Sequence, residues 1–157
     1  MATGLVTTGL VAGLTVLSAA TFTGVAGARE ATLVADTPCG VGVRACVSLR
    51  KQQAWLIEND KVSVGPVDIA TGGPGDETPV GDFVVEWKNK NHVSSEHRTP
   101  EGRPSPMPYS VFFAQGGIAF HQGDLDRASA GCVRLERENA ILFYDTLPLG
   151  AKVQVRP

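Results

Sequence analysis

The chain has 157 residues, of which 43% are hydrophobic and 19% are charged, and its formal net charge is -2. That length fits a single ordinary domain, and the near-neutral charge gives no basic surface field of the kind that nucleic-acid-binding proteins use. The 18 glycines and 10 prolines stand among short apolar runs, a balance that favours strands and turns over long helices. We therefore predict one strand-rich domain that does not bind nucleic acid.

The first 28 residues differ from the rest because they carry no charged side chain and end in Ala26-Gly27-Ala28. An apolar core followed by a small-x-small site is typical of a secretory signal peptide. An uncleaved anchor is the alternative, since the apolar stretch approaches membrane-spanning length, but its frequent Thr and Gly make it a poor anchor. We expect cleavage after residue 28, export to the cell wall, the periplasm-equivalent space or the medium, and no stable membrane association afterwards.

The three cysteines fall into a close pair and a distant third. Cys39 and Cys46 lie seven residues apart in a stretch whose glycines can turn the chain. Because disulfides persist in exported proteins, we predict a Cys39–Cys46 bridge, worth about 2.5 kcal/mol in the chain-entropy model. The bridge would tie an N-terminal arm, residues 29–44, to the first strand, and the start of that arm (29–38) is expected to be a mobile linker. Cys132 is left over, and a spare thiol in an oxidising compartment is a liability unless it is buried or used.

Strand-like patterns of β-branched and aromatic residues follow the arm and fill much of the chain. The expected strands are 45–49, 52–58, 61–70, 83–87, 109–114, 117–121 and 151–155. Asn59-Asp60 is predicted to form a hairpin turn, and the glycine- and proline-rich stretch 71–79 a loop. Trp55 and Trp87 are interpreted as core residues.

Two segments break the strand pattern. Residues 89–108 have no apolar periodicity and are predicted to form a long polar loop, which in a compact domain is usually functional or mobile. Residues 136–147 form the one convincing helix, since their apolar residues share one face and Glu136 and Glu138 complement the N-terminal end of the helix dipole.

One short stretch, HQGDLDRASAGCVRL at 121–135, holds the candidate chemistry. Small residues before Cys132 let the backbone approach a ligand and turn its amides toward one spot, as an oxyanion requires. His121 ends an apolar strand, and a neighbouring imidazole is the usual activator of a cysteine thiol. A buried, inert cysteine is the alternative. The histidine and cysteine spacing does not match zinc ligands, and no phosphate-binding loop is present, so we predict neither metal nor cofactor.

Four motifs resemble the L,D-transpeptidase catalytic domain of bacterial cell-wall enzymes, in particular short actinobacterial members. They are TPVGDF (78–83), MPYSVFF (107–113), IAFH (118–121) and SAGCVR (129–134), and the resemblance extends from about Ala45 to Val155. It implies a mainly β catalytic domain at 45–157, with sandwich-like mixed sheets and one short helix at about 136–147.

The resemblance also implies roles for individual residues. Cys132 would be the nucleophile and His121 its general base, with the backbone carbonyl of Gln122 orienting the imidazole ring, as an aspartate does in a serine protease triad. The amides of Gly131 and Cys132, together with the Tyr109 hydroxyl, would form the oxyanion hole.

Three further residues are expected to contact substrate. Ser129 matches the residue that opens the cysteine motif, and Arg134 matches an arginine that sets the site or holds a substrate carboxylate. The predicted loop 89–108, with His92, is expected to be a flap over the donor site, an exposed crossover being the alternative. The chain departs from the family at Ala130, where the motif has histidine.

The activity implied is acyl transfer on peptidoglycan tetrapeptide stems, with release of D-alanine and formation of 3→3 cross-links through an acyl-enzyme on Cys132. Carbapenems would acylate the same thiol. The protein is expected to be a monomer. An L,D-carboxypeptidase, a peptidoglycan-binding module weakened by the change at Ala130, and a secreted protein of unrelated role are the alternatives.

Overall fold

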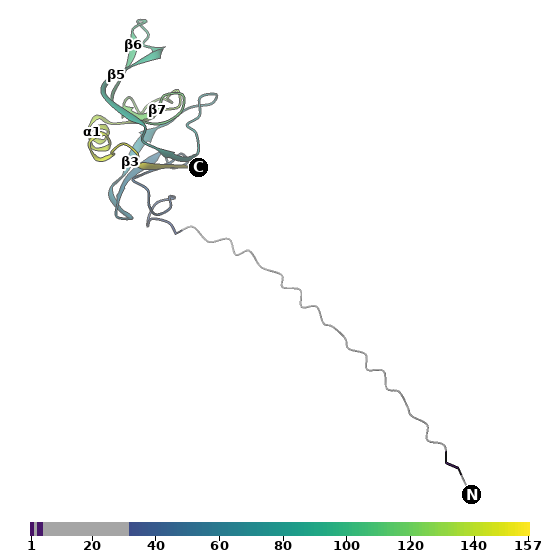
Figure 1. Ribbon diagram of the computed structural model, residues 1–157. Helices are drawn as coiled ribbons and strands as arrows, with labels where there is room; N and C mark the ends of the chain where they lie inside the picture. Colours follow the sequence, from purple (N-terminus) through teal and green to yellow (C-terminus); the bar gives the residue numbers. More distant parts are fainter. Residues whose placement is uncertain (2, 5–31) are drawn as a thin grey trace.

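The computed structural model describes residues 1, 3, 4 and 32–157, which form nine strands and one helix over the part described (Figure 1). The strands are β1 (Ala45–Ser48), β2 (Gln53–Glu58), β3 (Lys61–Ala70), β4 (Gly81–Val84), β5 (Trp87–Arg98), β6 (Pro104–Ala114), β7 (Ile118–Gln122), β8 (Val133–Leu135) and β9 (Lys152–Arg156), and the helix is α1 (Arg137–Thr146). Within these residues, no helix has the length and apolarity to cross a membrane. The expected signal peptide lies almost wholly outside the described residues.

The strands form one mixed sheet in the order β4-β9-β1-β2-β3-β8-β7-β6-β5. The pairs β1–β9 and β7–β8 are parallel and the others are antiparallel. The sheet curls on itself, because the chain just after edge strand β4 reaches β6, where the Glu86 amide donates to the Phe112 carbonyl at 2.8 Å. The predicted mainly β fold with mixed strands and one short helix is confirmed.

Helix α1 packs its apolar face against this curled sheet. Ala140 and Phe143 are fully buried, and the Phe143 ring lies 5.1 Å from that of Phe120 on β7. Lys88 of β5 binds the C-terminal end of α1, where its ammonium donates to the carbonyls of Tyr144 and Leu147, the latter at 2.9 Å. A cation at the C-terminus of a helix satisfies carbonyls that have no partner within the helix and complements the helix dipole.

The N-terminal arm covers the outer face of β1 and β2. The predicted disulfide between Cys39 and Cys46 is present, with its Cα atoms 5.8 Å apart. A small second core surrounds it, formed by Val34, Cys39, Val43, Cys46, Trp55 and Ile57. The expectation of a mobile linker is therefore wrong for residues 32–38. Val34 is buried, its amide donates to the Cys39 carbonyl, and its carbonyl accepts from the Thr37 amide, which holds this stretch in place.

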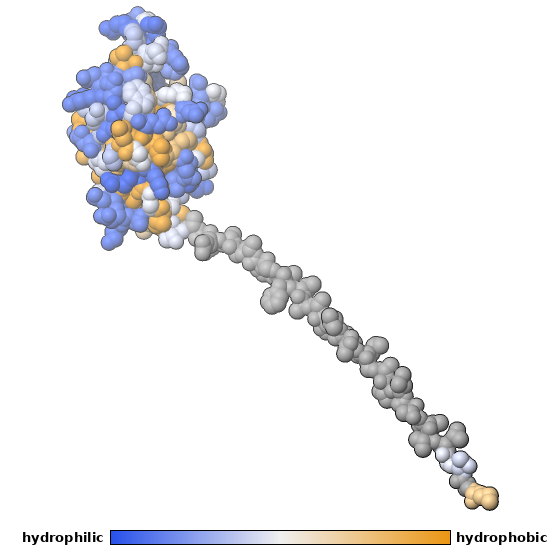
Figure 2. Space-filling view, in the orientation of Figure 1, coloured by the Kyte–Doolittle hydropathy of each residue, from blue (hydrophilic) through white to orange (hydrophobic). Residues whose placement is uncertain are grey.

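The expectation of a polar loop at 89–108 is also wrong. These residues belong to a β-hairpin in which β5 and β6 pair from Trp87–Phe112 to Arg98–Pro104, with a register shift beyond Val93–Pro106. The hairpin projects from the body of the protein (Figure 1). Its projecting tip is hydrophilic on the face shown in Figure 2. The apolar period is missing because most of the outer part of β5 is exposed to solvent. The prolines of β6 lie in its outer part, which pairs with β5 alone and tolerates proline as an edge strand does.

Candidate functional site

A cavity of about 540 Å³ opens between the β5–β6 hairpin, the β6–β7 turn and the segment that precedes β8. The cysteine segment contributes Arg127, Ala128, Ser129, Ala130 and Cys132, and the strands beside it contribute His121 and Arg134. The hairpin side contributes Trp87, His92, Ser94, Ser95, Glu96, His97, Ser105, Pro106, Met107 and Phe112, and the turn contributes Gly116 and Gly117. The fold therefore brings the histidine and the lone cysteine of the 121–135 stretch to one cavity.

His121 is held rigidly in strand β7. Its side chain is 7% exposed, and its Nδ1 lies 2.8 Å from the carbonyl oxygen of Gln122. A carbonyl can only accept, so Nδ1 carries a proton and, in the neutral ring, Nε2 is left as an acceptor. Burial, reinforced by the positive charge of Arg134, lowers the pKa of His121 to about 4. The imidazole is therefore neutral near pH 7 and able to accept a proton.

Cys132 is the one free cysteine among the described residues, and it is half-buried. Its thiol donates to the carbonyl of Gly117 in the β6–β7 turn, with Sγ 3.6 Å from the oxygen. Burial raises the pKa of Cys132, although the Ala119 amide and the charge of Arg134 act in the opposite direction. The resting group is therefore a thiol, which needs a base to become nucleophilic.

The loop 71–79 holds the cysteine segment through backbone hydrogen bonds. The Ser129 amide donates to the Thr71 carbonyl at 2.9 Å, and the Gly73 amide donates to the Ser129 carbonyl at 3.3 Å. Gly72 has no room for a side chain, since an added Cβ would lie 1.9 Å from the Asp76 carbonyl oxygen. This loop was predicted from its glycines and proline, but its contact with the cysteine segment was not.

Arg134 lies beside His121 because strands β7 and β8 are parallel and these two residues are register partners. It is 8% exposed, and its guanidinium donates to the Arg127 carbonyl. Gly123 packs on its aliphatic stem, where an added Cβ would lie 2.4 Å from Cδ. Much of the side chain thus packs against the 123–127 turn while the residue lines the cavity.

The hydroxyl groups of two expected site residues, Tyr109 and Ser129, make hydrogen bonds within the protein. Tyr109 does not line the cavity: its φ of 59° directs the ring toward α1, where it packs on Tyr144 and its hydroxyl accepts from Arg137 at 3.4 Å. Its hydroxyl therefore contacts a residue of α1, and the expected role as an oxyanion donor stays a prediction. Ser129 does line the cavity; its hydroxyl donates to the Cys132 carbonyl at 2.5 Å and so fixes the turn, which leaves only the oxygen lone pairs to contact a substrate.

An aromatic cluster forms the hairpin side of the cavity. Trp87 stacks on Phe112 with ring centroids 3.7 Å apart, and His92 meets both rings edge-on. His92 thus faces the cavity, as expected. Trp87 is 42% exposed and lines the cavity, so its interpretation as a core residue is wrong, whereas Trp55 is 2% exposed and belongs to the core.

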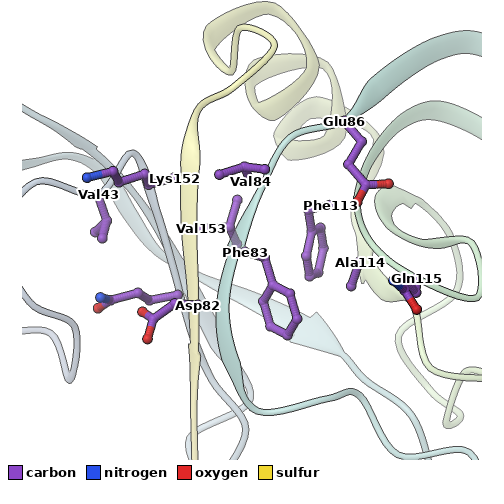
Figure 3. A pocket seen from close by; sticks show the side chains of 11 residues that line it. Val43, Asp82, Phe83, Val84, Glu86, Phe113, Ala114, Gln115, Lys152 and Val153 are labelled. Atoms are coloured by element: carbon purple, nitrogen blue, oxygen red, sulfur yellow. The ribbon is translucent and has the colours of Figure 1, made fainter.

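A second cavity, of about 430 Å³, lies between β4, β9 and the end of β6 (Figure 3). Phe83 and Phe113 stand side by side in it, with ring centroids 5.7 Å apart. None of the described residues that line it is a cysteine, serine or histidine. Over the same described part of the chain, no group of three or more His, Cys, Asp and Glu residues is arranged to hold a metal ion.

Comparison with known proteins gives consistent matches. Residues 33–155 match the family model of the L,D-transpeptidase catalytic domain, YkuD. The chain is 26% identical over 105 residues to probable L,D-transpeptidase 3 of Mycobacterium tuberculosis, which covers 59% of this chain and 39% of the relative. It is 26% identical over 121 residues to putative L,D-transpeptidase YqjB of Bacillus subtilis, covering 69% and 68%.

Among solved structures, an L,D-transpeptidase from Stackebrandtia nassauensis superposes with a TM-score of 0.63 at 28% identity. The match covers 72% of this chain and 56% of that protein. The chain thus spans 39% of the mycobacterial relative and 56% of the Stackebrandtia protein, so large parts of both have no counterpart in it.

Proposed function

The chain belongs to the L,D-transpeptidase catalytic-domain family, and from that membership we propose that it is a cysteine acyltransferase acting on the tetrapeptide stems of peptidoglycan. The observation that carries the proposal is that Cys132 and His121 line one cavity while the Gln122 carbonyl holds His121 Nδ1, leaving Nε2 as the proton acceptor. Nucleophile, base and orienting group are the three parts that covalent acyl transfer requires.

In the proposed first step, His121 Nε2 takes the thiol proton as Sγ attacks the carbonyl carbon of the third stem residue. The thiol pKa is raised and the imidazole pKa is lowered, so proton transfer accompanies attack and no stable thiolate–imidazolium pair precedes it. The oxyanion is stabilised by backbone amides of the cysteine segment. When the tetrahedral intermediate collapses, His121 returns the proton to the departing D-alanine amine and a thioester on Cys132 remains.

In the second step an amine from a neighbouring stem attacks the thioester carbonyl, with His121 again acting as base. The C–S bond breaks, His121 returns the proton to Cys132 Sγ, and a 3→3 cross-link forms. Attack by water at the same point would give an L,D-carboxypeptidase. The cavity carries Arg127 and Arg134, and we propose that Arg134 sets the positive field that attracts a stem carboxylate and that His92 contacts the substrate from the hairpin.

We further propose that the protein acts outside the cytoplasmic membrane as a monomer, after removal of residues 1–28, with residues 45–157 as the catalytic unit and residues 29–44 as its arm. The buried disulfide of the arm supports an oxidising location.

The test is acylation of intact protein by a carbapenem, followed by mass spectrometry, together with D-alanine release from a tetrapeptide. We expect a single adduct on Cys132, its loss in Cys132→Ala, and a reduction of at least about a hundred-fold in rate in His121→Ala. Absence of both adduct and D-alanine release in the wild-type protein contradicts the enzymatic proposal. If muropeptide binding persists in that case and Ala130→His restores turnover, the chain is a binding module that has lost activity at that position.

A further inference from the structure

Thr78 contacts the cysteine segment but is not among the residues that line the cavity. It is 3% exposed, and its hydroxyl donates to the carbonyl of Gly131 at an oxygen–oxygen distance of 2.8 Å. The same oxygen accepts from the amide of Gly72 at 2.9 Å. Because a hydroxyl has one proton and a carbonyl can only accept, these two contacts fix the direction in which Thr78 donates.

This contact sets the orientation of the peptide that joins Gly131 to Cys132. In a trans peptide the C=O and N–H bonds point in opposite directions. Thr78 holds the Gly131 carbonyl toward the buried side, so the Cys132 N–H points to the opposite side, toward the cavity that Cys132 lines. Within the described residues, the Cys132 amide donates to no backbone acceptor in a turn or loop.

The peptide would be free to rotate without such a contact. Gly131 has no side chain to restrict it and adopts a φ of 98°, where an added Cβ would lie 2.6 Å from Ile118 Cδ1. Glycine at such a position lowers the cost of rotating the adjoining peptide. On the other side of Cys132, the Ser129 hydroxyl holds the Cys132 carbonyl. Thr78 and Ser129 therefore fix the two peptides that flank the nucleophile.

We propose that Thr78 is a positioning residue, whose hydroxyl aims the Cys132 amide at the oxyanion formed during acyl transfer. The inference rests on the proposed acyltransferase function, and it adds a specific requirement to it. Acylation by a carbapenem passes through a tetrahedral oxyanion, and removal of one oxyanion donor typically costs about a hundred-fold or more in rate. Alkylation of the same thiol by iodoacetamide is a direct displacement at carbon and forms no oxyanion.

The experiment compares the two reactions of Cys132 in the same variants. In Thr78→Val the ratio of carbapenem acylation rate to iodoacetamide alkylation rate is expected to fall at least about tenfold, because the amide is misaligned and not removed. Thr78→Ser keeps the hydroxyl and is expected to stay within about threefold of wild type in this ratio. A role limited to stability would lower both reactions together or neither, and would leave the ratio unchanged.

Thr71→Val is the matched control. Thr71 belongs to the same loop and is 6% exposed, but its hydroxyl pairs with the side chain of Gln52 and does not contact the cysteine segment. Thr78→Val loses two hydrogen bonds and Thr71→Val loses one, so both melting temperatures are expected to fall, whereas the rate ratio is expected to fall only at position 78.

The outcomes separate the two proposals. A wild-type protein that is alkylated but never acylated contradicts the proposed function itself. A wild type that is acylated, with an unchanged rate ratio in Thr78→Val or an equal fall in Thr71→Val, overturns the role of Thr78 alone. If Thr78→Val does not fold, Thr78→Ala replaces it with the same expected fall in the rate ratio, because no side chain then holds the Gly131 carbonyl.

Discussion

His121 and Arg134 are register partners in the adjacent parallel strands β7 and β8, so a guanidinium lies beside the buried imidazole that accepts the thiol proton in the proposed reaction. Burial is the larger cause of the low pKa of His121, and the charge of Arg134 adds to it. The same charge acts on Cys132 in the favourable direction, since it lowers the pKa of the thiol against the effect of burial. One arginine thus adds to the lowering of the His121 pKa and opposes part of the rise in the Cys132 pKa.

Removal of this charge gives the first prediction. In Arg134→Met the pKa of His121 is expected to rise from about 4 toward its usual value near 6.5, but not to reach it, because burial remains. NMR titration of the His121 ring protons measures the shift directly. The acid limb of the acylation rate should move to higher pH by the same amount. A His121 titration that does not move would show that the guanidinium is screened from the ring.

The second prediction concerns stability in acid. The folded-state pKa of His121, about 4, lies below the unfolded value of 6.5, so the unfolded chain binds the proton first. Its contribution to the free energy of unfolding is unaffected above pH 6.5, and stability is lost as the pH falls from 6.5 to 4, by about 3 kcal/mol in total. Denaturant unfolding at pH 7.5 and 4.5 measures the loss. The variant His121→Gln should lose less unfolding free energy than the wild type between these two pH values, and the difference should be most of that total of about 3 kcal/mol. An equal loss in the variant and the wild type would contradict the low pKa of His121.

A third prediction follows from the way Lys88 holds the C-terminal end of α1. Lys88→Met keeps most of the stem but leaves two carbonyls without their donor, so the free energy of unfolding should fall by about 1 to 2 kcal/mol. Lys90→Met is the control: its ammonium lies over the Tyr109 ring at 5.6 Å but caps no helix. Its expected effect, measured by thermal unfolding, is below about 0.5 kcal/mol. Equal effects of the two substitutions would remove the helix-capping role.

The fourth prediction separates the two tryptophans. Trp87 is 42% exposed on the cavity wall, so Trp87→Leu should raise KM for a tetrapeptide several-fold through lost apolar contact while the fold is largely retained. Trp55 is 2% exposed, and Trp55→Leu should cost about 2 kcal/mol of stability or more without changing KM. Steady-state kinetics and thermal melts on both variants decide the matter. An unchanged KM in Trp87→Leu would exclude this wall from substrate binding.

The parts of the fold that depend only on residues close together in the sequence could be predicted. The Asn59-Asp60 hairpin turn is confirmed, with φ values of 50° and 58°, because positive φ at both central residues is a local property of these residue types. Strand β8 was not predicted: it has three residues, and it exists because β3 and β7 pair with it from both sides. The outer part of β5 was missed for a related reason, since its strand character comes from pairing with β6 and not from an apolar period.

The candidate site divides in the same way. The resemblance of the motifs predicted that His121 would bond the Gln122 carbonyl, and the structure places that contact at 2.8 Å. Tyr109 was misplaced because its left-handed backbone conformation turns the ring away from the cavity, which no strand pattern reveals. The motif at 78–83 predicted no role for Thr78, because its partner Gly131 lies 53 residues further along the chain.

The β5–β6 hairpin is fixed to the rest of the protein at its base only. At the base, Lys88 hydrogen-bonds the C-terminal end of α1 and Trp87 stacks on Phe112. At the tip, Thr99 makes backbone hydrogen bonds with residues 102 and 103 of the same hairpin. The tip can therefore be lengthened, shortened or exchanged without disturbing the strands that carry His121 and Arg134. On the proposed function, the tip sets how far the hairpin extends over a bound peptide while β7 and β8 carry the reacting groups, so the two can vary separately.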